Sequence, residues 1–243
     1  MKVMSFNIKH LIFEDLFGLW RKRYEKAKNY IKKEQPDILG VQELTRKGKK
    51  YFTKNLQDYQ IIGKRRHSII FTNEYNCMLI KKNIKILSHN TFSLSDKINV
   101  LGRKTKSDKF PRICVVAHVL INDKKYMIVN THMDNSDYKN KKRLLKIYNN
   151  ILASQKKEDE LVILTGDFNM TRKNNNLEEF AKDYNDPLKD DKTPTFIGKE
   201  EKMSLDYIFL DKRLNYKNAK VHSDSNDNGF ISDHHPISCE VEV

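Results

Sequence analysis

The feature that most restricts the fold of this chain is a series of short apolar runs, each followed at once by a polar side chain capable of catalysis. The clearest run, 161–164, fits a buried strand and leads through Gly166, where the backbone can turn, to Asp167 and Asn169. Side chains two residues apart on extended chain point the same way, so this carboxylate and amide would emerge together. Such a pair offers oxygen ligands for a hard cation and an N–H donor for a developing negative charge. The simpler alternative is an Asx turn that only caps its own backbone.

The same arrangement recurs along the chain, and the repetition favours one shared site over unrelated turns. Each residue alone has a structural explanation: Asn7 could end a strand in a turn, Glu43 could cap a helix, and His132 could be a buried structural histidine. Asp206 is harder to dismiss, because a carboxylate inside an apolar strand needs a partner. The six points are Asn7, Glu43, His132, Asp167 with Asn169, Asp206, and Asp233 with His234.

Strand-like and helical segments alternate along the whole chain, which indicates an α/β (α+β) protein. Expected strands cover 3–8, 38–42, 59–63, 68–71, 77–80, 84–92, 112–121, 125–131, 161–164, 205–210 and 237–243. Expected helices cover 21–33, 49–56, 137–154 and 177–184. Segments 93–110, 186–203 and 221–231 are polar and predict loops. No internal repeat or linker is visible, so we expect a single domain over residues 1–243.

The charge is strongly basic, with 46 Lys and Arg against 32 Asp and Glu and a formal net charge of +14. A positive field would attract polyanions such as nucleic acid, or draw the chain to anionic lipid. The alternative is compositional, because many lysines only keep helices solvated. Net charge alone does not decide between the two.

The cysteines and the apolar runs bear on the compartment. Cys77, Cys114 and Cys239 are odd in number and far apart, which argues against a disulfide framework or a zinc site and favours buried reduced thiols. No apolar run reaches the roughly 18 residues of a membrane span, so we expect no stable membrane insertion. The chain opens into a strand without a signal-peptide pattern. These observations predict a cytoplasmic protein, and we expect a monomer.

Six segments of the chain together resemble the endonuclease/exonuclease/phosphatase superfamily, which includes deoxyribonuclease I. They are, in chain order, M-S-F-N-I, D-I-L-G-V-Q-E, N-T-H-M-D, L-T-G-D-F-N, L-D-Y-I-F and S-D-H-H-P-I. The similarity runs from Val3 to Ile237. It implies a four-layer α/β/β/α sandwich, in which two mainly antiparallel or mixed sheets pack face to face with helices outside. The site would lie at one end of the sheets.

The resemblance also implies a divalent-metal-dependent phosphoesterase. Glu43 would be the main metal ligand, with Asn7 as a further oxygen ligand or a positioning group and Asp233 holding the metal or its waters. An oxygen-rich, cysteine-free ligand set suits Mg²⁺ or Mn²⁺ better than Zn²⁺.

The catalytic roles follow from the same resemblance. His234 would be the general base that takes a proton from water, and Asp206 would fix its tautomer. Asp167 would position the attacking water or bind metal, and Asn169 would donate to a non-bridging phosphate oxygen. Water would attack phosphorus in line with the leaving oxygen.

Further residues resemble family elements near the phosphate. His132 would contact the scissile phosphate or aid the leaving group, and its presence argues against an abasic-site endonuclease. Arg112 is a candidate phosphate-binding residue, with a strand-edge charge as the alternative. Glu74 matches a weaker element, and Lys9 stands where some nucleases carry arginine. Phe196 would lie beside the leaving group unless it is simply buried.

Three functions are compatible with these residues. The first is a nuclease or nucleotide phosphodiesterase, favoured by the net charge and by basic segments at 102–106 and 139–143. The second is a phosphatase or phospholipase C-type enzyme, acting on a lipid or small phosphate ester in the manner of sphingomyelinases or inositol phosphatases. The third is a binding protein whose chemistry is lost, which the presence of Glu43, Asp167 and His234 disfavours.

Overall fold

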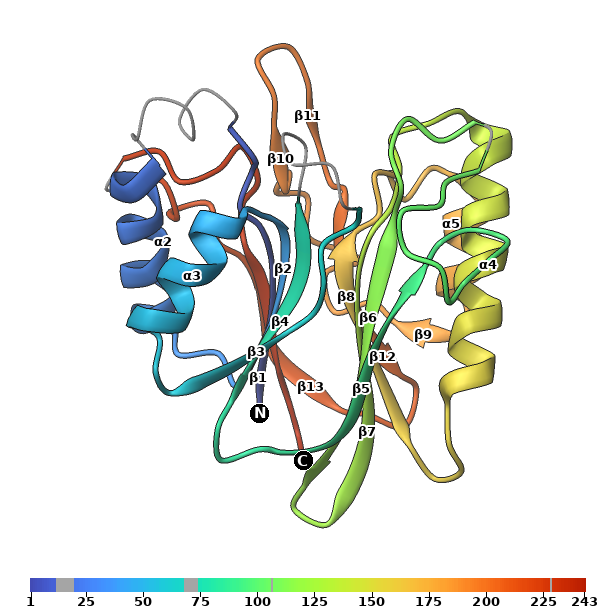
Figure 1. The fold of residues 1–243 in the computed structure, drawn as a ribbon, viewed down its shortest axis with the longest axis horizontal. Helices are drawn as coiled ribbons and strands as arrows, with labels where there is room; N and C mark the ends of the chain where they lie inside the picture. The colour runs from blue at the N-terminus through green and yellow to red at the C-terminus, as the bar shows by residue number, and fades with distance from the viewer. Residues whose placement is uncertain (12–19, 68–73, 106, 228) are drawn as a thin grey trace.

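Two six-stranded sheets pack face to face, and helices cover the outer side of each (Figure 1). The computed structural model describes residues 1–11, 20–67, 74–105, 107–227 and 229–243. The predicted four-layer α/β/β/α sandwich is therefore confirmed, with both sheets mixed. The expected strand at 68–71 lies outside the described residues.

The first sheet contains the first and last strands of the fold. Its strands, in spatial order, are β13 (Tyr216–Val221), β14 (Ile237–Val241), β1 (Lys2–Asn7), β2 (Ile38–Leu44), β4 (Tyr75–Lys81) and β3 (Tyr59–Ile62). Only β1 and β2 run parallel to each other. Helices α2 (Trp20–Glu34) and α3 (Arg46–Asn55) cover its outer face (Figure 1).

The second sheet has a similar plan, with one parallel pair near its centre. Its strands, in spatial order, are β5 (Lys85–Ser93), β6 (Ile113–Ile121), β7 (Lys124–His132), β8 (Leu161–Asp167), β12 (Asp206–Asp211) and β9 (Tyr184–Asn185). The parallel pair is β7 and β8. Helices α4 (Tyr138–Gln155) and α5 (Asn175–Ala181) lie on its outer side (Figure 1).

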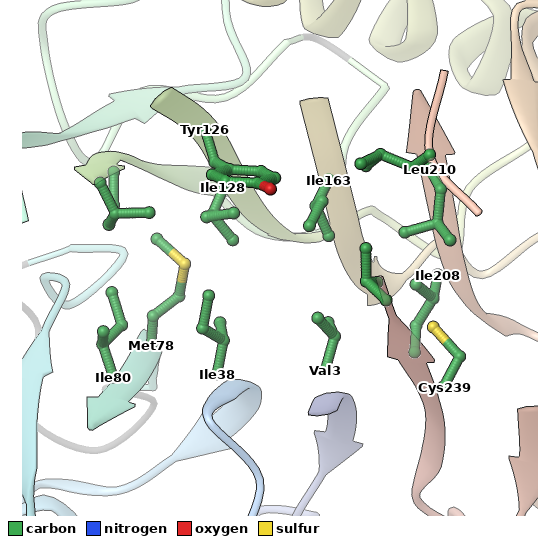
Figure 2. Packing of buried hydrophobic residues seen from close by; sticks show 14 of the residues in the cluster. Val3, Ile38, Met78, Ile80, Tyr126, Ile128, Ile163, Ile208, Leu210 and Cys239 are labelled. Carbon is green, nitrogen blue, oxygen red and sulfur yellow. The ribbon is translucent and has the colours of Figure 1, made fainter. Parts of the chain in front are cut away.

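The main core fills the space between the sheets. Val3, Ile38 and Met78 of the first sheet face Ile128 and Ile163 of the second, as Figure 2 shows. These strands alternate apolar side chains toward this core and toward the outer helices, so both faces of the central strands are buried. The central strands are thereby fixed on two sides.

The outer helices bury one apolar side each. Tyr24, Ala27 and Ile31 recur on α2 at helical spacing and pack on the first sheet. Leu144 and Tyr148 of α4 do the same on the second sheet. The other helix positions carry many lysines, most of which are exposed.

A buried polar contact links the sheets directly beneath one edge. The Gln42 side-chain amide donates to Asn130 Oδ1 at 2.7 Å, and Asn130 donates to the Cys77 carbonyl at 2.9 Å. Gly40 allows this approach, because a Cβ there would lie 2.4 Å from Thr165 Oγ1. Since buried polar groups are costly unless paired, this contact fixes how the two sheets align.

Several boundaries differ from the sequence prediction for physical reasons. The predicted turn at Gly166 is wrong: β8 continues through Asp167, and the glycine is needed because a Cβ would lie 2.3 Å from the Thr131 carbonyl oxygen. The segment predicted as a loop over 186–203 contains a hairpin, β10 (Phe196–Ile197) with β11 (Lys202–Met203). The edge strand β13 was not predicted, because most of its side chains are exposed and show no apolar alternation.

Other expectations can be checked directly. The three cysteines are free and buried, as predicted. The segment predicted as a surface loop over 93–110 has buried members, among them Leu94, Thr105 and Asp108. In the described part of the chain, no helix is long and apolar enough to cross a membrane.

Candidate active site

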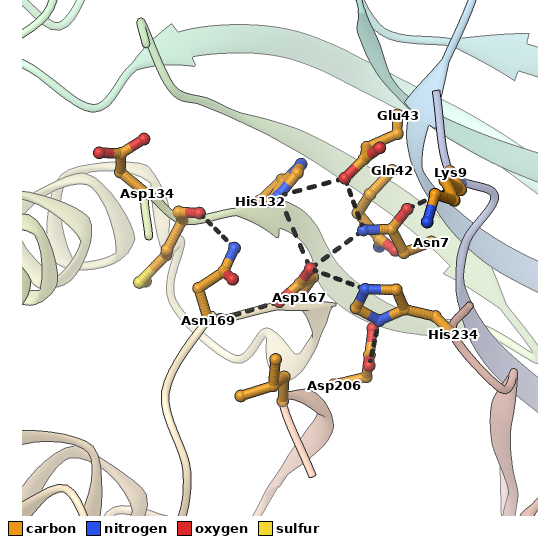
Figure 3. Close-up of polar contacts among 12 residues, drawn as sticks. Asn7, Lys9, Gln42, Glu43, His132, Asp134, Asp167, Asn169, Asp206 and His234 are labelled. Atoms are coloured by element: carbon orange, nitrogen blue, oxygen red, sulfur yellow. Dashed lines mark hydrogen bonds and ion pairs between the residues drawn. The ribbon is translucent and has the colours of Figure 1, made fainter. Parts of the chain in front are cut away.

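Four central strands bring their ends to one edge of the sandwich. Parallel pairing places Asn7 of β1 beside Gln42 of β2, and His132 of β7 beside Asp167 of β8. Glu43 lies inside β2 rather than after it, with a left-handed φ of 58° at a register shift between strands β2 and β4. Such a bulge redirects a side chain, and here the carboxylate of Glu43 turns toward the other sheet (Figure 3).

The amide of Asn7 joins the two sheets at this edge. Its Nδ2 donates to Glu43 Oε1 and to Asp167 Oδ2, both at 3.0 Å (Figure 3). Its Oδ1 accepts from the backbone N–H of Lys9 at 2.9 Å. In this orientation Asn7 acts as a positioning group that holds two carboxylates together, and its role as a metal ligand stays a prediction.

His234 is held by two residues from β12 and the segment before it. Asp206 Oδ2 lies 2.8 Å from His234 Nδ1, so the ring presents Nε2 toward Asp167 Oδ2 at 3.8 Å. Thr195 Oγ1 donates to the same Asp206 oxygen at 2.6 Å and accepts from the Leu205 N–H at 2.9 Å. The predicted pairing of Asp206 with His234 is present in the structure.

The two groups that face each other here have strongly shifted pKa values. Burial would lower the pKa of His234, but Asp206 first, and then Asp167 and Asp233, raise it to about 10. Burial and the neighbouring Asp206 raise the pKa of Asp167 to about 7, against the opposing effects of His234 and Asn7. Strong shifts in a cleft are typical of catalytic groups.

His132 faces the same carboxylates from the second sheet. Its Nε2 lies 3.6 Å from Asp167 Oδ2 and 3.9 Å from Glu43 Oε1 (Figure 3). Burial, and then the cations Arg112 and Arg66, lower its pKa well below the usual value. A neutral imidazole in this position can donate a hydrogen bond to an anion.

Asn169 and Asp167 form the Asx turn considered for this stretch, and they also face the site. The Asn169 N–H donates to Asp167 Oδ1 at 2.8 Å, and its side-chain amide donates to the Met133 carbonyl at 2.9 Å. Asp167 thus uses one oxygen for the turn and presents the other to Asn7. The Asx turn is present, and it leaves Asp167 Oδ2 facing the cleft, while the predicted catalytic roles of both residues stay predictions.

Two further candidate residues, Arg112 and Lys9, are already paired with carboxylates. Arg112 Nε donates to the fully buried Asp134 at 3.0 Å. Lys9 forms an ion pair with Asp233. Arg112, Lys9 and Asp233 all line the cleft, and the predicted phosphate-binding role of Arg112 stays a prediction.

An open cleft of about 940 Å³ lies above these residues. Its floor contains Glu43, His132, Asp167 and His234. A sequence profile of the Endonuclease/Exonuclease/phosphatase family matches residues 4–234. The chain belongs to this family.

Solved structures of the endonuclease/exonuclease/phosphatase family share the whole fold. One is a family protein from Bacteroides vulgatus, with 23% identity, a TM-score of 0.86, and coverage of 100% of this chain and 98% of that one. The mannosyl-6-phosphatase of Bacteroides thetaiotaomicron VPI-5482 has 20% identity, a TM-score of 0.86 and full coverage of both chains. D. rerio TDP2 complexed with single strand DNA product has 15% identity, a TM-score of 0.76, and coverage of 100% and 99%. A comparison with curated protein sequences gives no significant match.

The donor set fits the divalent cation typical of endonuclease/exonuclease/phosphatase enzymes. Among the described residues, one group of three metal-binding side chains has ligand atoms within 4.8 Å of one another, namely Asp167, Asp206 and His234. Asp206 Oδ1 is buried without a hydrogen-bond partner, and Asp167 carries a raised pKa that a cation would relieve. This trio differs from the predicted set of Asn7, Glu43 and Asp233, and the predicted ligand roles stay predictions.

Some residues that line this family member's cleft were not singled out from the sequence. Phe196 was considered, and its ring packs on His234 with a centroid distance of 5.0 Å, whereas its neighbour Thr195, which supports Asp206 behind the cleft, was not. Lys141 was noted only as part of a basic segment. Tyr138 and Lys173 were not considered, because exposed residues of these types carry no signal without the fold.

Proposed function

We propose that this protein hydrolyses phosphodiester bonds in a nucleic acid or nucleotide, with Mg²⁺ or Mn²⁺ as its cofactor. The observation that carries the proposal is the orientation of the His234 ring. Asp206 Oδ2 lies 2.8 Å from Nδ1 of this ring, so that Nε2 points into a cleft lined by carboxylates and by lysine and arginine side chains. Hydrolysis of a phosphodiester needs a base that takes a proton from water, hydrogen-bond donors for the phosphate oxygens and cations that offset the phosphate charge. The cleft contains side chains of each kind.

In the proposed reaction, His234 Nε2 accepts a proton from the attacking water. Asp206 stabilises the imidazolium that forms, and Thr195 holds Asp206 in place. Asp167, 3.8 Å from His234 Nε2, orients the water toward phosphorus. Asp167, one of the carboxylates that raise the pKa of His234, would also bind the cation. Neutralising it would lower that pKa and favour the ring form that accepts a proton.

Neutral donors serve the phosphate oxygens in this proposal. His132 Nε2 and the Asn169 amide lie on the same side of Asp167 and would donate to non-bridging oxygens. Glu43 and Asp167, held together by Asn7, would bind the divalent cation. When bound, that cation polarises the phosphoryl group and stabilises the leaving oxygen.

A second candidate is a phosphatase for a small phosphate monoester. It is favoured by the full-length superposition on a mannosyl-6-phosphatase at a TM-score of 0.86. At 20% identity this likeness concerns the fold alone. It therefore supports the phosphatase less strongly than the cationic side chains of the cleft support a phosphodiesterase.

The test measures hydrolysis of a panel with added Mg²⁺ or Mn²⁺ and with EDTA. The panel contains single-stranded DNA, RNA, bis-p-nitrophenyl phosphate, p-nitrophenyl phosphate, mannose 6-phosphate and a lipid phosphodiester. We expect metal-dependent cleavage of a nucleic acid and of bis-p-nitrophenyl phosphate, and loss of both with EDTA. Turnover of monoesters alone would replace the proposal with the second candidate, and turnover that persists in EDTA would reject the metal.

A further inference from the structure

The cationic side chains of the cleft divide into two kinds. Lys9 and Arg112, close to the catalytic carboxylates, are each paired with a carboxylate, Asp233 and Asp134. Lys141 and Lys173 also line the cleft, but within the described residues neither forms an ion pair. The first two charges are already neutralised, and the second two are available to a ligand.

Lys141 and Lys173 lie on the wall formed by α4 and the segment after β8. Lys141 is half-buried, and burial lowers the pKa of its ammonium although Asp134 and Asp167 partly counteract this. A partly desolvated cation without a contacting anion gains more from binding one than a fully solvated lysine does. Lys173 lies six residues after Asp167, in the segment between β8 and α5.

An exposed aromatic ring accompanies the lysines on the same wall. Tyr138 lies three residues before Lys141 on α4, so the two side chains share one side of the helix. Tyr138 is 53% exposed and lines the cleft. An exposed ring beside cations can stack on a nucleobase, which a sugar phosphate without a base would not use.

The β10–β11 hairpin lines another part of the cleft. It contributes the apolar side chains of Phe196 and Met203 and the carboxylate of Glu201. Within the cleft, Glu201 contributes a negative charge and Lys141 and Lys173 contribute positive charges. A second anionic group on a substrate would therefore be bound more favourably beside the two lysines. The charges that line the cleft therefore favour one orientation of a bound phosphodiester over the other.

We propose that Lys141, Lys173 and Tyr138 form a subsite for a second phosphate and its nucleoside, next to the phosphate that is cut. This inference rests on the proposed function and narrows its substrate class. The preferred substrate carries at least two phosphates joined through a nucleoside, as in a polynucleotide or a bisphosphorylated nucleotide, rather than one isolated phosphate ester.

The kinetic test uses the thymidine dinucleotide phosphodiester with no terminal phosphate or with one at either end, in the presence of Mg²⁺. The wild type should cleave one phosphorylated form with a kcat/KM at least about tenfold above that of the unphosphorylated form, mainly through KM. Lys141→Gln and Lys173→Gln should each remove most of this preference. Lys142→Gln is the matched control, since it removes the same charge from an exposed neighbour on α4 that does not line the cleft.

Two results would overturn the subsite. One is that the wild type and the three variants all show the same preference for a phosphorylated dinucleotide. The other is that Lys141→Gln and Lys173→Gln lower kcat/KM equally on every dinucleotide, which would indicate a role in folding or in the chemistry. If the wild type cleaves none of the dinucleotides, the substrate panel described above decides on the proposed function, and calorimetry decides on the subsite alone. Thymidine carrying phosphates on both hydroxyls should bind the wild type about tenfold tighter than thymidine monophosphate, and Lys141→Gln should abolish the difference. Equal affinities would reject the subsite.

Discussion

Two adjacent histidines show how much the surroundings decide at the scale of one residue. His234 points into the cleft and is held by Asp206, whereas His235 points away and lies 3.2 Å from Ser225 Oγ. Both are buried. The pKa of His234 is raised by three carboxylates, while burial lowers the pKa of His235.

This difference gives a matched pair of variants. We expect His234→Gln to reduce kcat by about a thousandfold or more, because the proposed base is lost and no neighbour replaces it. His235→Gln should keep activity within a few fold. Steady-state kinetics on bis-p-nitrophenyl phosphate, with circular dichroism to confirm folding, is the measurement. A folded His234→Gln enzyme with near-normal rates would remove His234 from the mechanism.

At this scale the sequence predicted which residues gather, but not how they touch. Four of these residues could be predicted because they lie at or near the ends of strands that meet at one edge: Asn7, Glu43, His132 and Asp167. His234 could be predicted because it lies just before the last strand. The left-handed backbone of Glu43 and the ion pair of Lys9 with Asp233 could not be, since they depend on a register shift and on contacts between distant segments. The predicted roles of these residues stay predictions.

At the scale of elements, the end of β13 packs against α2 through a buried histidine. His222 Nδ1 lies 2.8 Å from the Tyr30 hydroxyl, and its Nε2 lies 2.7 Å from Ser238 Oγ of β14. Burial lowers the pKa of His222 to about 4, although Glu34 partly opposes this. The ring is therefore neutral in the folded protein at neutral pH.

This contact predicts a pH dependence of stability. Between about pH 6.5 and pH 4 the unfolded chain binds a proton at His222 that the folded chain does not, so stability falls as the pH falls. We expect His222 to account for about 2 kcal/mol of the loss in unfolding free energy between pH 7 and pH 5. Urea unfolding of the wild type and His222→Gln at both pH values measures this. The variant should lose less on acidification, and equal losses would contradict the prediction.

Predictability differed among the elements for a similar reason. Strands β6, β7 and β8 are long and apolar because both of their faces are buried, so the sequence predicted them well. Strand β13 and the β10–β11 hairpin have exposed or very short pairings, so their residues carry no periodic signal. The hairpin matters most, because it places Thr195 on Asp206.

At the scale of the whole molecule, the net charge of +14 separates two kinds of substrate. Binding a polynucleotide releases counterions, so its affinity falls steeply with salt, whereas a small ester contacts few charges. We expect KM for a single-stranded DNA oligomer to rise by about tenfold or more between 50 and 200 mM salt, and KM for bis-p-nitrophenyl phosphate to change little. Parallel salt dependences for the two substrates would show that the charge is compositional.

The order of the strands determines how much of the chain is needed to complete the first sheet and the candidate site. Strand β1 lies between β2 and β14, and the Ser232 hydroxyl donates to the Asn7 carbonyl across 225 residues of sequence. Residues near the start of this fold therefore complete their sheet only with residues near its end. A chain that stops before residue 206 lacks both Asp206 and His234, and one that stops before 234 lacks the base. The Asp206–His234 pair, and with it the proposed activity, therefore requires the chain to extend at least through residue 234.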